Sequence, residues 1–175
     1  MSGGALLPGL LAAALLLVLA GVVKVRQPGP AVSFLAALGL PAPRLLVGAG
    51  ALLEIGAGGS ALVLPRPGAA AIALLYASFT AIVTLQLRRG VSVSCGCFGA
   101  RTIPPSRVHL WLNVLCVAIA SASLAVPPPS FASVAGSNPF AAALAGFAAA
   151  AVALLAAAAV TLFPATMGAW HGAGA

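Results

Sequence analysis

Residues 6–23 read LLPGLLAAALLLVLAGVV, a run of 18 residues without a charged side chain. A helix needs about 20 mostly apolar residues to cross the hydrocarbon core of a bilayer. No Lys or Arg precedes this run and no small-x-small cleavage site follows it, so we interpret it as a retained span, not a signal peptide. Four further apolar segments lie along the chain, at 45–64, 69–87, 108–126 and 140–163. The pattern predicts an all-α membrane protein, a bundle of four core transmembrane helices plus a fifth C-terminal helix.

Composition agrees with a bilayer environment. Hydrophobic residues make up 62% of the chain and charged residues 5%, where a soluble domain has about 25% charged residues. Eight basic side chains and one acidic side chain cannot cover a water-exposed surface. The formal charge of +7 sits at the ends of the apolar runs, without the basic stripe and interleaved aromatic residues of a nucleic-acid-binding surface. We therefore expect the lipid bilayer, and no nucleic acid, as a partner.

The segmentation predicts two parts. Residues 1–126 would form the four-helix membrane domain, and residues 127–175 a loop followed by the additional helix. Asn138 and Pro139 resemble a helix cap followed by a first-turn proline. Pro164 is expected to end the last helix.

Basic residues mark one side of the predicted bundle. Seven of them follow the first and third spans: Lys24, Arg26, Arg44, Arg88, Arg89, Arg101 and Arg107. The opposite side has only Arg66. We expect the chain to lie in the inner or plasma membrane of the cell. Because basic residues near span ends favour the cytoplasm, the bias predicts that the basic side of the bundle faces the cytoplasm. The short apolar stretch 32–40 lies on the same side and is expected at the interface or beneath the bundle.

The loop after the third span contains the most reactive residues of the chain. Cys95 and Cys97 are separated only by Gly96, whose backbone freedom permits the angles of a very small disulfide ring. A strained disulfide has a more oxidising potential and exchanges readily with thiols. Nearby arginines, Arg88, Arg89 and Arg101, would favour the thiolate form. The motif predicts a redox-active pair.

Two other interpretations of this pair remain open. Paired thiolates also bind copper(I) or zinc, with His109 as a third candidate ligand. Alternatively, both cysteines are reduced and without a chemical role, and the helices form the docking surface of a non-catalytic assembly subunit.

Glu54 is the only acidic residue and lies in the middle of the second span. A carboxyl group at that depth is costly, which makes it a candidate for function. Gly50 and Gly58 lie four residues to either side and share its helix face. Because small residues let a neighbouring helix approach closely, we expect Glu54 to face the bundle interior. It would either make a structural hydrogen bond between helices or act in proton transfer or in contact with a quinone.

The fourth span has a polar stripe. His109, Asn113 and Cys116 follow at i, i+4 and i+7. We expect a small polar interior layer formed by the following side chains: Glu54, Tyr76 or Thr80, Asn113 and Cys116, with His109 nearer the cysteine loop. The alternative is polar packing between helices, which we favour for Thr80 and Thr84.

Taken in order, these residues resemble the methylamine utilisation protein MauE family, within the broader DoxX-like group of small four-helix membrane proteins. The resemblance covers about residues 5–126. The matching elements are Lys24 followed by Pro28 and an apolar segment ending at Leu40-Pro41, Glu54 in the second span, the segment CGCFG at 95–99, and Asn113.

The resemblance implies disulfide handling, with a thioredoxin-like partner, during maturation of an exported client; in the family that client is a methylamine dehydrogenase subunit. The chain is thus a candidate component of a thiol–disulfide oxidoreductase. From the redox pair and Glu54 themselves, apart from the resemblance, a quinone is a candidate cofactor. The candidate catalytic residues are Cys95, Cys97, Glu54, His109 and Asn113. The resemblance also implies that the cysteine pair lies outside the cytoplasm, against the charge bias. Nothing carries over to Cys116, whose role stays open.

Overall fold

The computed structural model describes residues 3–40, 42–90, 93 and 106–172, with side chains up to residue 160. Every regular element in these ranges is a helix: a 3-10 turn at Gly3–Leu6, α1 (Leu7–Arg26), α2 (Gly29–Ala37), α3 (Arg44–Ser60), α4 (Pro65–Arg89), α5 (Arg107–Ala125), α6 (Phe131–Ser137) and α7 (Pro139–Gly172). Four segments of this described part are long and apolar enough to cross a membrane: Gly3–Arg26, Pro65–Arg89, Arg107–Ala125 and Pro139–Val160. The predicted all-α membrane fold is confirmed.

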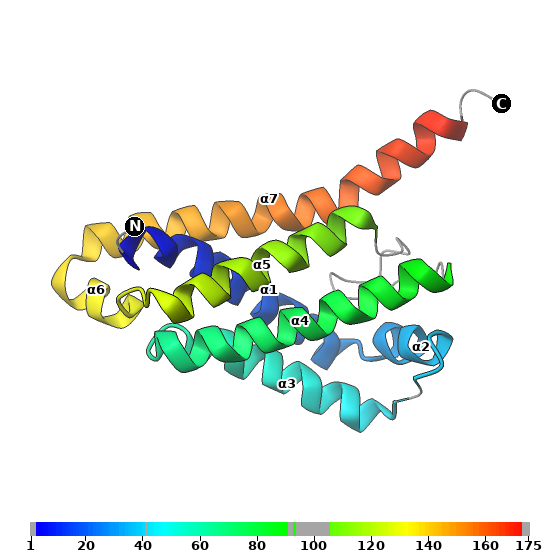
Figure 1. Cartoon of the computed structure of the whole chain (residues 1–175), viewed down its shortest axis with the longest axis horizontal. Coiled ribbons are helices and arrows are strands. Elements are labelled where there is room, and N and C mark those ends of the chain that lie inside the picture. Colours follow the sequence, from blue (N-terminus) through cyan, green and yellow to red (C-terminus); the bar gives the residue numbers. More distant parts are fainter. Residues whose placement is uncertain (1–2, 41, 91–92, 94–105, 173–175) are drawn as a thin grey trace.

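Helix α1 lies at the centre of the bundle. It contacts α3, α4, α5 and α7, while α3, α4 and α5 follow one another antiparallel on one side of it (Figure 1). Leu10 and Leu17 of α1 pack with Ile72 and Tyr76 of α4 and Ala120 of α5 in one buried cluster. The most continuous apolar run of the sequence thus forms the core, because a helix that is apolar nearly all round can be buried among several others.

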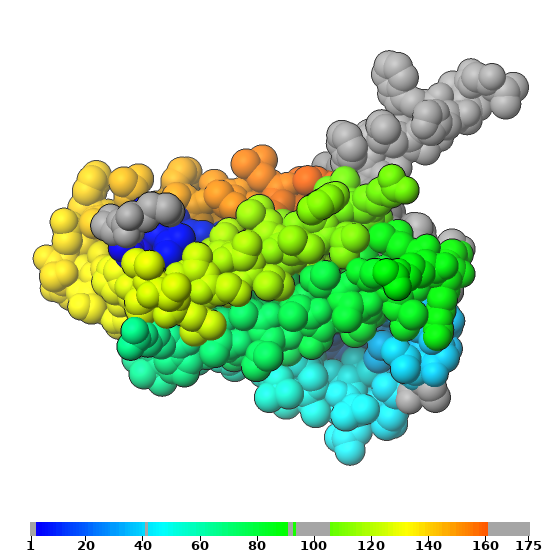
Figure 2. Space-filling view, viewed as in Figure 1, coloured from blue at the N-terminus to red at the C-terminus, as the bar shows by residue number. Residues whose placement is uncertain are grey.

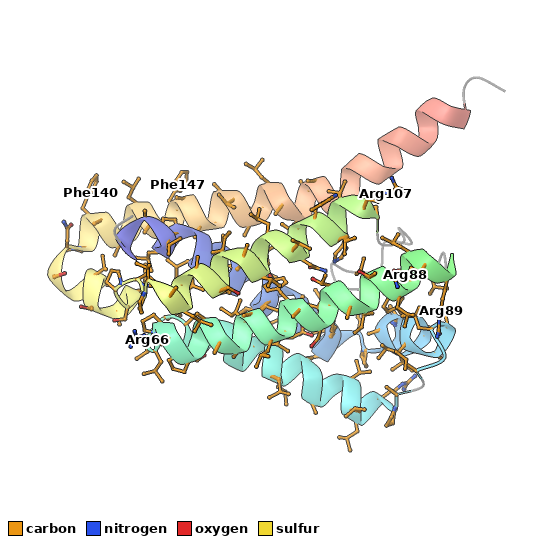
Figure 3. All side chains as sticks on the ribbon, viewed as in Figure 1. Arg66, Arg88, Arg89, Arg107, Phe140 and Phe147 are labelled. Atoms are coloured by element: carbon orange, nitrogen blue, oxygen red, sulfur yellow. The ribbon has the colours of Figure 1, made fainter. Side chains whose placement is uncertain are left out.

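Large apolar side chains cover the outside of the bundle. Phe140 and Phe147 of α7 project outward with 80% and 75% of their surface exposed (Figure 3). Leu45, Leu74 and Trp111 are similarly exposed on α3, α4 and α5. Extensive exposed apolar surface is rare on soluble monomers, whereas a bilayer covers it without cost. The arrangement is that of a multi-pass membrane protein.

Several boundaries differ from the predicted ones. The second span was expected over 45–64, but α3 ends at Ser60 and has 17 residues. Pro65 lies at the first position of α4, where a proline is tolerated because its missing N–H would be unsatisfied anyway. The apolar stretch at 32–40 falls on the short helix α2 and the turn after it.

The C-terminal part has one confirmed and one wrong prediction. The Asn138 side chain caps α7, since its Oδ1 accepts a hydrogen bond from the backbone N–H of Ala141 at 3.0 Å. Pro164 does not end α7, which continues to Gly172. A proline within a helix removes one hydrogen bond and bends the axis without ending the helix where its surroundings are apolar. Figure 1 shows the last turns of α7 leaving the bundle at an angle.

Glycines bring α1 and α3 into backbone contact. A Cβ atom on Gly58 would lie 2.6 Å from the Ala14 carbonyl oxygen, and one on Gly21 would lie 2.7 Å from that of Ala51. The predicted close approach is therefore confirmed at Gly58. It is wrong at Gly50, where no atom lies within 4 Å of an added Cβ. The helices separate at that level, and a cavity takes the place of the contact.

Candidate functional site

The two ends of the bundle differ in charge. Arg88, Arg89 and Arg107 lie at the end where α4 finishes and α5 begins, and Arg66 lies at the other (Figure 3). The C-terminus of α1 and the N-terminus of α3 are at this same basic end (Figure 1). The segment between α4 and α5, which contains Cys95 and Cys97, therefore connects helix ends on the basic side. Both cysteines lie outside the described residues.

A buried ion pair lies between α1 and α3. Lys24 Nζ donates a hydrogen bond to Glu54 Oε1 at 2.5 Å, with 8% of Lys24 and 4% of Glu54 exposed. The same Nζ lies 4.8 Å from the centroid of the Phe79 ring, within the range of a cation–π contact. Glu54 thus faces the interior as expected, and its charge is balanced by Lys24. A buried charge is tolerated when it is paired in this way.

The ion pair opens onto a cavity of about 220 Å³ between five helices. Its walls are mostly apolar. They come from α1 (Leu16, Leu17, Ala20, Lys24), α2 (Ala31, Phe34, Leu35), α3 (Leu46, Val47, Gly50, Glu54), α4 (Tyr76, Phe79, Ile82, Val83) and α5 (His109, Asn113), with Ala42 before α3. Figure 2 shows the hollow between α4 and the α2–α3 side, with α1 at its floor.

Four polar side chains besides Lys24 line this cavity: Glu54, Tyr76, His109 and Asn113. The Tyr76 hydroxyl donates to the Ala13 carbonyl oxygen at 2.9 Å. In contrast, Glu54 Oε2 and Asn113 Nδ2 are buried and have no hydrogen-bond partner among the described residues. Unsatisfied buried polar atoms are uncommon in native proteins, where water, an ion or a ligand commonly provides the missing partner.

The predicted polar layer is only partly present. Glu54, Tyr76 and Asn113 meet at the cavity, with His109 also on its wall. Cys116 does not line the cavity, but it lies beside Tyr76 in the buried cluster around α1 and hydrogen-bonds to it. Its side chain is apolar enough to join that cluster.

The two threonines of α4 make local bonds. Thr80 Oγ1 donates to the Tyr76 carbonyl oxygen at 2.8 Å, and Thr84 Oγ1 donates to that of Thr80 at 2.7 Å. Their hydroxyls are satisfied within the helix, which agrees with the packing interpretation.

Two side chains near the C-terminus of α4 donate hydrogen bonds to backbone carbonyl oxygens outside the helix. Arg89 Nη1 donates to the Leu38 carbonyl oxygen at the C-terminus of α2. Gln86 Nε2 donates to the Val93 carbonyl oxygen at 3.2 Å, just beyond the helix. Arg89 therefore has a structural partner in α2, besides the role near the cysteine loop that the sequence suggested.

Sequence reasoning missed the partner of Glu54. Lys24 was counted among the charges that set orientation, because it lies near the end of the first span. Two features could have separated it from the others. It is flanked by valines within an apolar run, and a lone acid inside a membrane span needs a cation.

A family model described as methylamine utilisation protein MauE matches residues 3–126. The matched range includes Lys24, Glu54, Asn113 and both loop cysteines. No curated protein and no solved structure matches the chain.

Proposed function

The chain belongs to the methylamine utilisation protein MauE family, and from this premise we propose that it is a membrane thiol–disulfide redox protein supporting the maturation of an exported partner. The family match associates this multi-pass membrane protein with methylamine utilisation. The redox role is supported by one observation above the others: the matched range contains Cys95-Gly96-Cys97, in the segment that joins α4 to α5.

The proposed reaction is a disulfide exchange. A partner thiolate attacks the Cys95–Cys97 disulfide, and a mixed disulfide forms as one loop thiol is released. A second partner thiol then closes the partner's disulfide and frees the other loop thiol. The partner has lost two electrons and two protons, and the loop has gained them. A thioredoxin-like disulfide or a quinone would reoxidise the loop.

The proposal gives the cavity residues a role in proton movement. His109 lies in the first turn of α5, directly after the cysteine loop, and Asn113 lies one turn further along. Both line the cavity that also holds Glu54. A proton released in the loop thus has buried polar groups leading from His109 toward the ion pair. General acid–base groups act within hydrogen-bond reach or through one water molecule.

The test is complementation of a strain that lacks the protein. Cys95→Ser and Cys97→Ser should each abolish maturation, measured as free thiols remaining in the exported methylamine dehydrogenase subunit. Cys116→Ser is the control, because this thiol packs in the core and is expected to change maturation little. Normal maturation in both loop variants would overturn the redox proposal in favour of an assembly subunit.

Metal analysis of the purified protein separates the remaining alternative. The redox proposal expects a reversibly oxidised pair without stoichiometric copper or zinc. Stoichiometric metal that is lost with either loop cysteine would replace the redox role by metal binding.

A further inference from the structure

We propose that the cavity binds the head of a membrane-soluble quinol, with the Glu54 carboxylate as hydrogen-bond acceptor and the Asn113 amide as donor. The binding site is inferred from the cavity alone. The role of the corresponding quinone as electron acceptor of the cysteine pair, with the quinol as product, rests on the proposed function.

The unsatisfied atoms define the polar contacts of the ligand. Glu54 is 4% exposed; its Oε1 holds Lys24, and its Oε2 has no partner among the described residues. Asn113 is 3% exposed, and its Nδ2 is equally without a partner there. One atom accepts and the other donates, from α3 and α5 across one cavity. A hydroxyl group meets both requirements, because it donates its hydrogen and accepts at its oxygen.

The charges favour a neutral head. Lys24 and Glu54 cancel, so the pair leaves no net charge to attract an ion. A phosphate would face the unpartnered carboxylate oxygen, and a cation would compete with Lys24 for Glu54. Tyr76 and His109 are the other titratable groups on the wall. A neutral hydroxylated head avoids both penalties, since burying an unbalanced charge is costly.

The apolar walls favour an aromatic ring. Phe34, Tyr76 and Phe79 contribute rings from α2 and α4. An engineered protein cavity of about 150 Å³ holds benzene, so the cavity of about 220 Å³ has room for a substituted six-membered ring. Offset or edge-to-face contacts with aromatic walls would orient it.

The cavity also reaches the lipid-facing side of α3. Leu46 lines it and is 61% exposed, and the space beside Gly50 is empty. An apolar tail attached to the ring can therefore lie in the bilayer while the head is inside. These features together describe a hydroxylated aromatic head with a lipid-soluble tail, the chemistry of a quinol.

The two redox forms should differ in affinity. A quinol hydroxyl can donate to Glu54 Oε2, whereas a quinone offers only acceptor oxygens and keeps only the bond from Asn113. A hydrogen bond to a charged group is among the stronger ones in proteins, so its loss should weaken binding about tenfold or more.

Binding can be measured by calorimetry on the full chain in nanodiscs. The Cys95→Ser/Cys97→Ser variant prevents electron transfer between the probe and the cysteine pair, and trimethylhydroquinone is compared with its dimethyl ether, which lacks the donors. We expect the ether to bind at least about tenfold more weakly. Equal affinity of the two probes would overturn the assignment of Glu54 as acceptor and the proposal with it.

A matched pair of variants locates the site. Gly50 and Gly48 both lie on α3 with no atom within 4 Å of an added Cβ, but only Gly50 lines the cavity. Gly50→Leu should reduce quinol affinity at least about tenfold, and Gly48→Leu should leave it unchanged. If Gly50→Leu leaves the affinity unchanged, the probe only partitions into the lipid, and the assignment of the binding site to the cavity is overturned. If the protein binds no quinol but maturation still depends on Cys95 and Cys97, the proposed redox function holds and the quinol site is refuted.

Discussion

Lys24 Nζ and Glu54 Oε1 lie 2.5 Å apart, although the two residues are 30 positions apart in the chain. The pair connects the central helix α1 to α3, beside the backbone contact made at Gly21. It is also the polar floor of the cavity, so one interaction serves both the packing of the bundle and the candidate site.

Breaking this pair on one side should be strongly destabilising. Glu54→Gln leaves the Lys24 ammonium buried without its counter-charge, which costs about 3–5 kcal/mol when one partner of a buried pair is removed. Thermal unfolding of the purified protein in mild detergent measures the loss. The double variant Lys24→Met/Glu54→Gln should recover much of it, because no unpaired charge remains. A loss in the double variant equal to the sum of the losses in Lys24→Met and Glu54→Gln would mean that the two residues are not coupled.

Gly58→Ala should destabilise the contact between α1 and α3. Its new methyl group would lie 2.6 Å from the Ala14 carbonyl oxygen, and backbone atoms must shift to admit it. Overpacking of this kind costs about 1–3 kcal/mol. Gly56→Ala on the same helix is the matched control, since no atom lies within 4 Å of its Cβ; it should be neutral or slightly stabilising. The same unfolding measurement compares them, and equal effects would argue against the close approach.

Tyr76→Phe should cost about 0.5–1.5 kcal/mol, the usual contribution of one hydrogen bond. The lost bond joins α4 to the Ala13 carbonyl oxygen of α1. Ser78→Ala, two residues away, removes a hydroxyl that only bonds to the Leu74 carbonyl oxygen of its own helix. Denaturation should therefore shift for Tyr76→Phe and barely for Ser78→Ala. A comparable shift in both would assign the effect to α4 itself.

Orientation can be decided by thiol labelling in intact cells. The charge bias predicts that the end with Arg66 and α6 faces outside. In a chain without its native cysteines, Ser133→Cys on α6 should then react with a membrane-impermeant maleimide. Native Cys95 and Cys97 should react only after the cells are opened.

The reverse pattern would place the cysteine loop on the exported side. Labelling of the loop cysteines only after mild reduction would in addition show an exposed, oxidised pair. That result would favour the disulfide role of the family over the charge rule.

The bundle could be predicted because a helix that crosses the bilayer needs a continuous apolar run of about 20 residues, which is visible in the sequence. Runs such as 6–23 and 108–126 gave helices within a few residues of the expected limits. Pro164 misled because a proline can bend a helix without ending it where no water competes for the backbone. Helix α6 was missed because its seven residues carry no apolar period.

The candidate site was harder to predict. Glu54 stood out through the cost of an acid at its depth, but the flanking valines of Lys24 did not say which residue it would meet. Two residues 30 positions apart meet only through the packing of α1 on α3. Gly50 and Gly58 have the same spacing from Glu54, yet one borders a cavity and the other a backbone contact. A small residue permits close packing without requiring it, so the cavity could only be found in three dimensions.

The 17 residues of α3 make it the shortest helix of the four-helix core. At 1.5 Å per residue, α3 is about 26 Å long and the 25-residue α4 about 37 Å, around a bilayer core of about 30 Å. The ends of α4 contain Arg66, Arg88 and Arg89 and can extend beyond that core, whereas a helix shorter than the core is met by thinning of the adjacent lipid. The thinned lipid lies on the side where Leu46 and Gly50 border the cavity. Bilayer thickness, which is set by acyl-chain length, would therefore have its largest effect at the lipid-facing side of α3. This is the side through which a lipid-soluble molecule would reach Glu54.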